Sequence, residues 1–214
     1  MTIELNKFDL DTWEENTVTL IISDERHPIA ENLCHKFLEK YHESHLTSDI
    51  CVVFSQYCDY VDKQFHYDHY DHDILGKIIS RQKKLRKTEN MQSVLLLFDD
   101  DITSQKLAED FMLKELIFTG IHYNITIVMR IPYEHTYEGN KMIHNIRYDP
   151  GIRSRLDYVI MYPSKKHEHV HVNVHLFYEQ FFGDIGLESY MAMCMAMNES
   201  HALVYTYNKG ITYL

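Results

Sequence analysis

The chain has 214 residues, of which 45% are hydrophobic and 25% are charged. These values are typical of a globular protein, and we expect one domain spanning residues 1–214. The formal net charge of −11 argues against a broad nucleic-acid-binding face, although it leaves room for a local basic groove. No apolar run reaches the ~20 residues that a membrane-spanning helix needs, and the first residues do not resemble a secretory signal. We therefore expect a protein that is neither membrane-embedded nor secreted.

Two residue counts limit the kinds of site the chain can carry. The four cysteines (Cys34, Cys51, Cys58 and Cys194) form no C-x-x-C pair, which favours reduced thiols in a cytosol-like compartment. Glycine is scarce, with 7 residues, so few positions suit a glycine-rich phosphate loop.

The first half of the chain alternates strands with helices. Apolar and β-branched runs predict strands at 17–22 and 49–55, and a third, with five consecutive apolar residues, at 93–99. Helical periodicity predicts helices from Pro28 to about residue 45 and over 74–87, with Pro28 in the first helical turn.

The 93–99 strand lacks polar alternation, which is typical of a central strand buried on both faces of a parallel sheet. It ends in Asp99, Asp100 and Asp101. The carboxyl ends of strands are where open α/β sheets bind ligands, and P-loop NTPases place a metal-site and a catalytic carboxylate there. The alternative is an acidic turn that caps the next helix, and the local pattern does not separate the two.

The second half continues the alternation. We expect a helix over 104–118 ending at Thr119-Gly120, and a strand over 124–130 stopped by Ile131-Pro132. A short helix near 140–146, a strand at 156–161, one or two helices between 170 and 197 and a strand at 202–207 follow. The alternation predicts an α/β fold with a parallel or mostly parallel sheet.

Three segments in this order resemble the DNA-packaging ATPases of large DNA viruses, in the FtsK–HerA group. They are the acidic-ended strand, T-G-I-H-Y-N-I-T-I-V-M-R-I-P at 119–132 and G-I-R-S-R-L-D-Y-V-I-M at 151–161. The helix with Arg81-Gln82 is also similar to one in that family. The resemblance implies a three-layer P-loop NTPase fold of the RecA-like ASCE type, with ATP and Mg²⁺ as cofactors.

The phosphate-binding loop that the resemblance implies is absent. Placed after the first strand, G-x-x-x-x-G-K-S/T reads Ser23, Asp24, Glu25, Arg26, His27, Pro28, Ile29, Ala30. Pro28 has no N–H to offer a phosphate, Ile29 removes the lysine ammonium and Ala30 removes the Mg²⁺ ligand. Only Arg26 and His27 add positive charge. We predict that the loop does not work as a phosphate cradle.

Of the remaining site positions that the resemblance implies, some match the family pattern and others depart from it. Asp99 matches the Mg²⁺ ligand, Asp100 the catalytic acid and Arg153 a trans-acting arginine. Arg130 stands where the family has a glutamine that orients water, and Ile121 where it has an arginine. The leading hypothesis is a homologue with a degenerate loop that acts as a non-hydrolysing partner or regulatory subunit. The alternative is an active ATP-driven motor that moves viral DNA into the capsid.

The resemblance also implies partners and a location. An active packaging ATPase homologue, another virion protein and DNA are candidate partners, whereas the oligomeric state stays open. The implied location is the infected host cytoplasm (a viral factory) or the virion.

We interpret the histidine-rich and methionine-rich segments as structural rather than metal-binding. His66, His69 and His72, and separately His167, His169, His171 and His175, have spacings that a metal site could use, but solvated or helical segments fit them better. The run at 190–197 predicts a packing or interface helix, because methionine fills irregular gaps.

Overall fold

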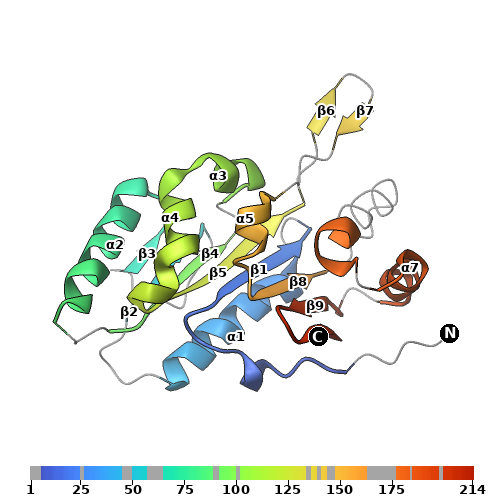
Figure 1. The fold of residues 1–214 in the computed structure, drawn as a ribbon, viewed down its shortest axis with the longest axis horizontal. Coiled ribbons are helices and arrows are strands. Elements are labelled where there is room, and N and C mark those ends of the chain that lie inside the picture. Colours follow the sequence, from blue (N-terminus) through green and yellow to red (C-terminus); the bar gives the residue numbers. More distant parts are fainter. Residues whose placement is uncertain are drawn as a thin grey trace.

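In a computed structural model of the chain (Figure 1), described residues are 6–24, 27–44, 50–56, 65–88, 92–99, 102–133, 136–138, 141–143, 148–162, 177–183, 185–197 and 200–214. Among the described helices, none is both long and apolar enough to cross a bilayer.

An eight-stranded sheet forms the centre of the molecule, in the order β10-β9-β8-β1-β5-β4-β2-β3. Its strands are β1 (Val18–Ser23), β2 (Ile50–Phe54), β3 (His66–Tyr67), β4 (Val94–Asp99), β5 (Ile125–Pro132), β8 (Tyr158–Met161), β9 (Leu203–Thr206) and β10 (Gly210–Tyr213). The pairs from β8 through β3 are parallel, and only β8–β9 and β9–β10 are antiparallel. The predicted mostly parallel α/β sheet is confirmed.

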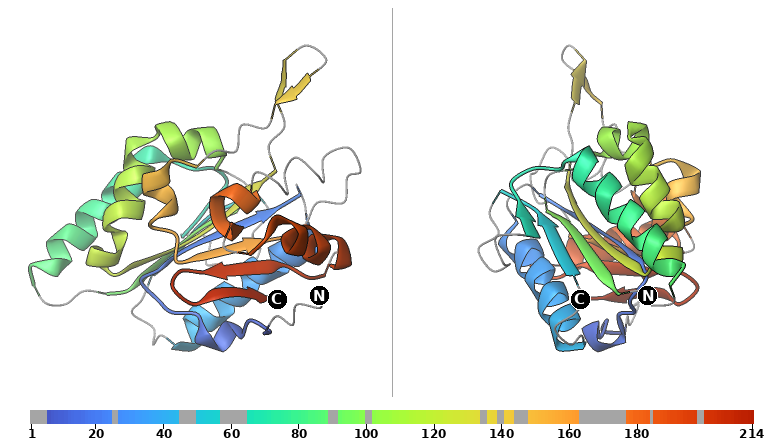
Figure 2. Two further views of the ribbon diagram at one scale, coloured as in Figure 1. Left: turned by 45° about the vertical axis from the view of Figure 1, so that its right-hand side comes forward. Right: turned by 90° about the vertical axis from the view of Figure 1, so that its left-hand side faces the viewer.

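Helices cover both faces of this sheet, which gives three layers (Figure 2). Successive residues of a strand point to opposite faces. Leu95 and Leu97 of β4 pack with α1 (Pro28–Ser44), whereas Leu96 and Phe98 pack on the other side. That second face is covered by α2 (His72–Arg86), α4 (Phe111–Thr119), α5 (Pro150–Arg153), the π-helical turn η4 (Tyr178–Phe182) and α7 (Leu187–Ala196).

The strand order brings the ends of three strands together. β1 lies between β5 and β8, and β5 separates it from β4. The β1–α1 connection and the carboxyl ends of β4 and β5 therefore meet at one edge of the sheet. This is the edge where parallel α/β sheets bind ligands.

Three predicted elements need correction. The helix expected over 104–118 is two helices, α3 (Ser104–Glu109) and α4, because Asp110 caps α4 by accepting hydrogen bonds from Met112 N and Leu113 N. The strand expected to stop at Arg130 continues to Pro132, alongside β1. Where the described part overlaps the helix expected near 140–146, it is strand β7 (Lys141–Ile143), paired with β6 (Thr136–Glu138) as an antiparallel hairpin.

Besides the β6–β7 hairpin and α5, two short helices and two strands were not predicted. The helices are the 3-10 turns η1 (Leu10–Thr12) and η3 (Gly120–Tyr123), with Gly120 at the C-cap of α4 as expected. The edge strands β3 and β10 are short and carry no long apolar run.

The first histidine-rich segment and the methionine-rich segment lie within the described residues. His66 Nε2 lies 2.5 Å from the carbonyl oxygen of Ser55, and His69 lies beside Gln56. Within the described ranges, no cluster of three or more His, Cys, Asp or Glu residues could hold a metal. The second histidine run, 167–175, lies outside the described residues. In α7, Tyr190 and Cys194 pack into the core, which confirms the predicted packing helix.

Candidate functional site

The strand ends bring Asp99 and Arg130 side by side. In the β4–β5 pairing, Asp99 lies directly opposite Arg130, and Arg130 lies opposite Ile21 in the β5–β1 pairing. Leu97 and Val128, two residues earlier in their strands, both face α1. Because side chains alternate along a strand, Asp99 and Arg130 also point toward α1.

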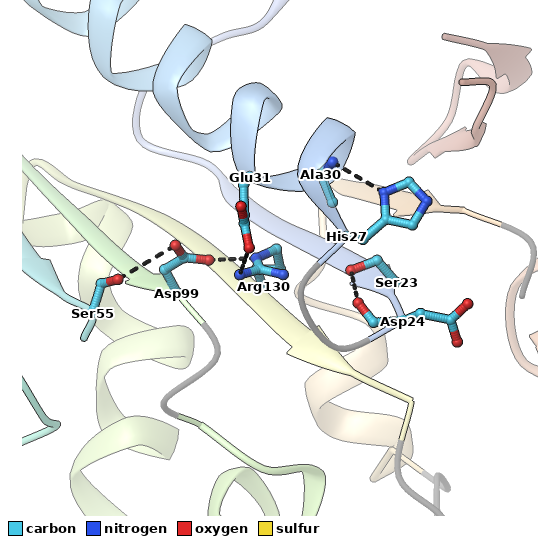
Figure 3. A network of polar contacts seen from close by, with 8 residues as sticks. All are labelled: Ser23, Asp24, His27, Ala30, Glu31, Ser55, Asp99 and Arg130. Carbon is cyan, nitrogen blue, oxygen red and sulfur yellow. Dashed lines mark hydrogen bonds and ion pairs between the residues drawn. The ribbon is translucent and has the colours of Figure 1, made fainter. Parts of the chain in front are cut away.

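Arg130 is buried between carboxylates from two elements (Figure 3). Its side chain is 2% exposed, its Nε donates to Asp99 Oδ1, and its Nη2 lies 3.5 Å from Oε1 of Glu31 in the first turn of α1. The second oxygen of Asp99 accepts a 3.4 Å hydrogen bond from Ser55 Oγ at the end of β2. We call Glu31, Ser55, Asp99 and Arg130 the arginine cluster. Asp99 therefore has both carboxylate oxygens engaged inside the protein.

Two side chains of the connection between β1 and α1 form hydrogen bonds within the connection itself. Ser23 Oγ donates to the Asp24 carbonyl at 3.1 Å, and His27 Nδ1 accepts from Ala30 N at 3.3 Å. The His27 ring packs against Tyr162, with ring centroids 4.8 Å apart. Pro28 opens α1 as predicted, and Ala30 is fully buried. Arg26 lies outside the described residues.

The site residues that the structure describes do not fit Mg²⁺ and a nucleotide. In a P-loop site the metal bridges a carboxylate at the end of one strand and a hydroxyl in the first turn of the helix that follows the phosphate-binding loop. Here the Arg130 guanidinium bridges the same two elements, from Asp99 to Glu31. Ala30 offers no hydroxyl, and Ile29 offers no ammonium. A metal would have to displace a buried arginine that already neutralises Asp99.

The structure does not bring all the expected site residues together. Asp100 lies outside the described residues. Arg153 ends α5 and is half-buried, and its Nη1 donates to the carbonyl of Gln180 at 3.4 Å, within its own chain. Its contact is thus with η4 rather than with the arginine cluster, and a trans-acting role would require that contact to break.

The Arg81-Gln82 pair has a structural explanation. Gln82 is fully buried, and its Nε2 donates to the carbonyls of Gln92 and Tyr123 at 2.7 and 2.9 Å. One amide thus ties α2 to the segments that precede β4 and β5. Arg81 donates to Gln82 and Gln92 and holds this arrangement.

Sequence reasoning missed Glu31 and Ser55. Glu31 directly follows the eight loop positions, so a first-turn carboxylate facing Arg130 was a readable signal. Ser55 closes β2, and only the β2–β4 pairing shows that it reaches Asp99.

No protein-family model and no curated protein sequence matches the chain. Among solved structures, it is similar to the genome packaging NTPase B204 of Sulfolobus turreted icosahedral virus 2, solved in complex with AMP. The TM-score is 0.61 at 12% identity, over 94% of this chain and 98% of that one. The DNA-packaging ATPase B204 of Sulfolobus turreted icosahedral virus matches with a TM-score of 0.58 at 10% identity, over 93% and 97% of the two chains. The chain has the fold of a packaging ATPase.

A secretion ATPase shares this packaging-ATPase fold. The cytoplasmic domain of the type VII secretion ATPase EccC from Thermomonospora curvata matches with a TM-score of 0.56 at 11% identity. The match covers 94% of this chain and 25% of EccC. The predicted resemblance is confirmed for the fold, and at these identities the chemistry has to be argued from the residues themselves.

Proposed function

We propose that this protein is a non-hydrolysing packaging-ATPase homologue that serves as a partner or regulatory subunit of a viral genome-packaging machine. The arginine cluster is the observation that carries the proposal. It supplies Asp99 with an internal cation, at the place where a working site would need a metal and a lysine.

The electrostatics make the cluster hard to reverse. A guanidinium that is 2% exposed has lost most of its hydration, and the carboxylates of Asp99 and Glu31 compensate for that loss. Opening the cluster for Mg²⁺ would leave the guanidinium without its Asp99 partner. At the two loop positions that supply the lysine and the metal-binding hydroxyl in a working site, Ile29 and Ala30 are apolar and offer no ligand in return.

Binding of Mg-ATP tests the proposal directly. We expect no heat of binding and no rise in unfolding temperature at millimolar Mg-ATP for the natural chain. A functional site at about 100 times its dissociation constant would add ~2.7 kcal/mol to the free energy of unfolding, which is a shift of a few degrees. A Mg²⁺-dependent ATPase activity that Asp100→Asn abolishes would overturn the proposal in favour of the motor.

A pair of repair variants separates the loop from the cluster. The first restores the loop with Ser23→Gly, Pro28→Gly, Ile29→Lys and Ala30→Thr. The second adds Arg130→Gln. If the internal cation blocks the site, only the second gains Mg-ATP binding, and equal gain in both variants would show that Arg130 is no obstacle.

The basic face of α2 supports DNA as a partner of this subunit. Of the chain's 21 Lys and Arg residues, six lie within residues 77–87, and Asp73 is the only acidic residue of α2. Lys83 pairs with Glu115 and Arg86 lies over the Tyr123 ring, whereas Lys77, Lys84 and Lys87 are exposed. A groove of about 790 Å³ between α2 and α4 is lined by Lys77, Lys83 and Lys84 among others.

Such a face binds phosphates without reading bases. Favourable charges at a helix C-terminus lie in its last turn, but Lys77 and Arg81 lie further back, so the helix dipole does not account for them. Lysines that neutralise backbone phosphates release counterions, which makes the affinity salt-dependent. In a chain of net charge −11, we propose this face as the local basic groove that the composition left room for.

Salt-dependent DNA binding tests this surface. Lys77→Glu with Lys84→Glu should weaken binding of labelled duplex DNA and reduce the slope of log K against log salt by about 1 per lost phosphate contact. Lys106→Glu with Lys209→Glu makes the same change in net charge on other surfaces and should leave the slope unchanged. Equal effects of the two double variants would show that only net charge matters.

A further inference from the structure

A second pocket lies on the opposite side of α1 from the arginine cluster. Ile29, Asn32, Leu33 and Lys36 line it and recur at the spacing of one helix face. Glu31, which faces Arg130, lies about 200° around the helix from Ile29. The pocket has a volume of about 570 Å³, within the range of small-molecule sites.

The opposite wall is built by two chain segments that pair with each other. The backbone of Lys7 forms an isolated parallel β-bridge with Tyr213 of β10, and Phe8 N donates to the Tyr213 carbonyl at 2.6 Å. This pairing places Phe8, Leu10 and Leu214 around the pocket, with Tyr162 beside them. The walls are therefore mainly apolar.

Three polar groups of this pocket lack a partner in the described part of the chain. The exposed ammonium groups of Lys7 and Lys36 form no ion pair there. The carboxylate of Asp9, also at the pocket, accepts from Asp11 N instead. Tyr162 is 1% exposed, and its buried hydroxyl has no hydrogen-bond partner there. A buried hydroxyl without a partner costs about 1–3 kcal/mol, so it calls for an explanation.

We propose that this pocket binds a small organic anion, with an apolar or aromatic body and one carboxylate or phosphate group. The apolar walls take the body, Lys7 and Lys36 meet the negative charge, and the Tyr162 hydroxyl donates to an acceptor on the ligand. Burial raises the pKa of Tyr162, so the hydroxyl keeps its proton at neutral pH. The inference does not depend on the proposed function, because none of the arginine cluster lines this pocket.

Matched aromatic probes test the site on the full chain by isothermal titration. 2-Naphthoate and 2-naphthyl phosphate should bind, and the neutral 2-naphthamide should bind at least tenfold more weakly. The tighter of the two anions identifies the preferred group. Failure of both anions to bind at millimolar concentration, or equal affinity for the amide, would overturn the proposal.

Variants place the binding in this pocket. Lys7→Gln with Lys36→Gln should lower the affinity for the preferred anion at least tenfold, whereas Lys106→Gln with Lys209→Gln should not. Tyr162→Phe should weaken binding without lowering the unfolding temperature, since it removes a hydroxyl that has no partner in the free protein. Natural affinity in the Lys7/Lys36 variant would contradict the site, and natural affinity in Tyr162→Phe would contradict the role of the hydroxyl.

Discussion

The two halves of the candidate site differ in what holds them. The strand half, at the ends of β4 and β5, is a buried network in which Arg130 and Asp99 compensate each other's charge. In the loop half, from Ser23 to Ala30, the side chains of Ser23 and His27 form hydrogen bonds within the loop, and the His27 ring packs on Tyr162. The difference shows that a strand carboxylate can persist in this fold without a phosphate loop, provided that another group supplies the cation.

Arg130→Gln should have the largest effect on stability. It leaves Asp99 and Glu31 without their shared cation, and breaking a buried ion pair from one side costs about 3–5 kcal/mol. Urea unfolding measures the loss. A loss below about 1 kcal/mol would mean that water reaches the cluster, and that the strand half contributes no more to stability than the loop half does.

Asp99→Asn should cost somewhat less. An amide oxygen still accepts from Arg130, but the guanidinium keeps only the more distant carboxylate of Glu31, so we expect a loss of about 2–4 kcal/mol. The same unfolding experiment, repeated with millimolar Mg²⁺, should give an unchanged stability for the natural chain. A Mg²⁺-dependent rise that Asp99→Asn removes would show that Asp99 binds metal after all.

Ile29→Lys probes the loop half and should cost little. Residue 29 is half-buried at the edge of the core, so a lysine there gives up part of this packing. It also meets the unfavourable end of the α1 dipole, worth about 0.3–1 kcal/mol. A loss as large as that of Arg130→Gln would contradict the contrast between the halves.

Glu31→Gln should have the smallest effect. Its side chain is 39% exposed and its oxygen lies 3.5 Å from Arg130, so solvent screening leaves about 0.2–1 kcal/mol. A double-mutant cycle with Asp99→Asn measures the coupling between the two carboxylates. Strong coupling would place Glu31 within the buried network rather than at its rim.

Most of the sheet was predictable because its strands are long apolar runs. The failures came where the decisive signal was a single residue. Asp110 divides one predicted helix in two by capping the second, and an Asp before F-M-L was a readable N-cap. At 136–143, the Gly-Asn dipeptide between two short strands is a hairpin signal that outweighs the weak helical pattern.

The site was only half predictable, for a different reason. Asp99 and Arg130 were each recognised, but their ion pair depends on the register of β4 against β5, which no local pattern specifies. The resemblance pointed to a missing glutamine at position 130. Only the packing shows that the arginine there serves as a cation for the neighbouring carboxylate.

The position of β1 within the sheet has a consequence for how the protein folds during synthesis. Val18 pairs with Ile127 and Thr19 with Tyr158, so both neighbours of β1 are made on the order of a hundred residues later. At ~5–20 residues per second, this apolar strand waits on the order of ten seconds for its first partner. Until then its unpaired backbone is open to wrong pairing with other chains. β1 is therefore the segment that a chaperone on the ribosome would have most reason to cover.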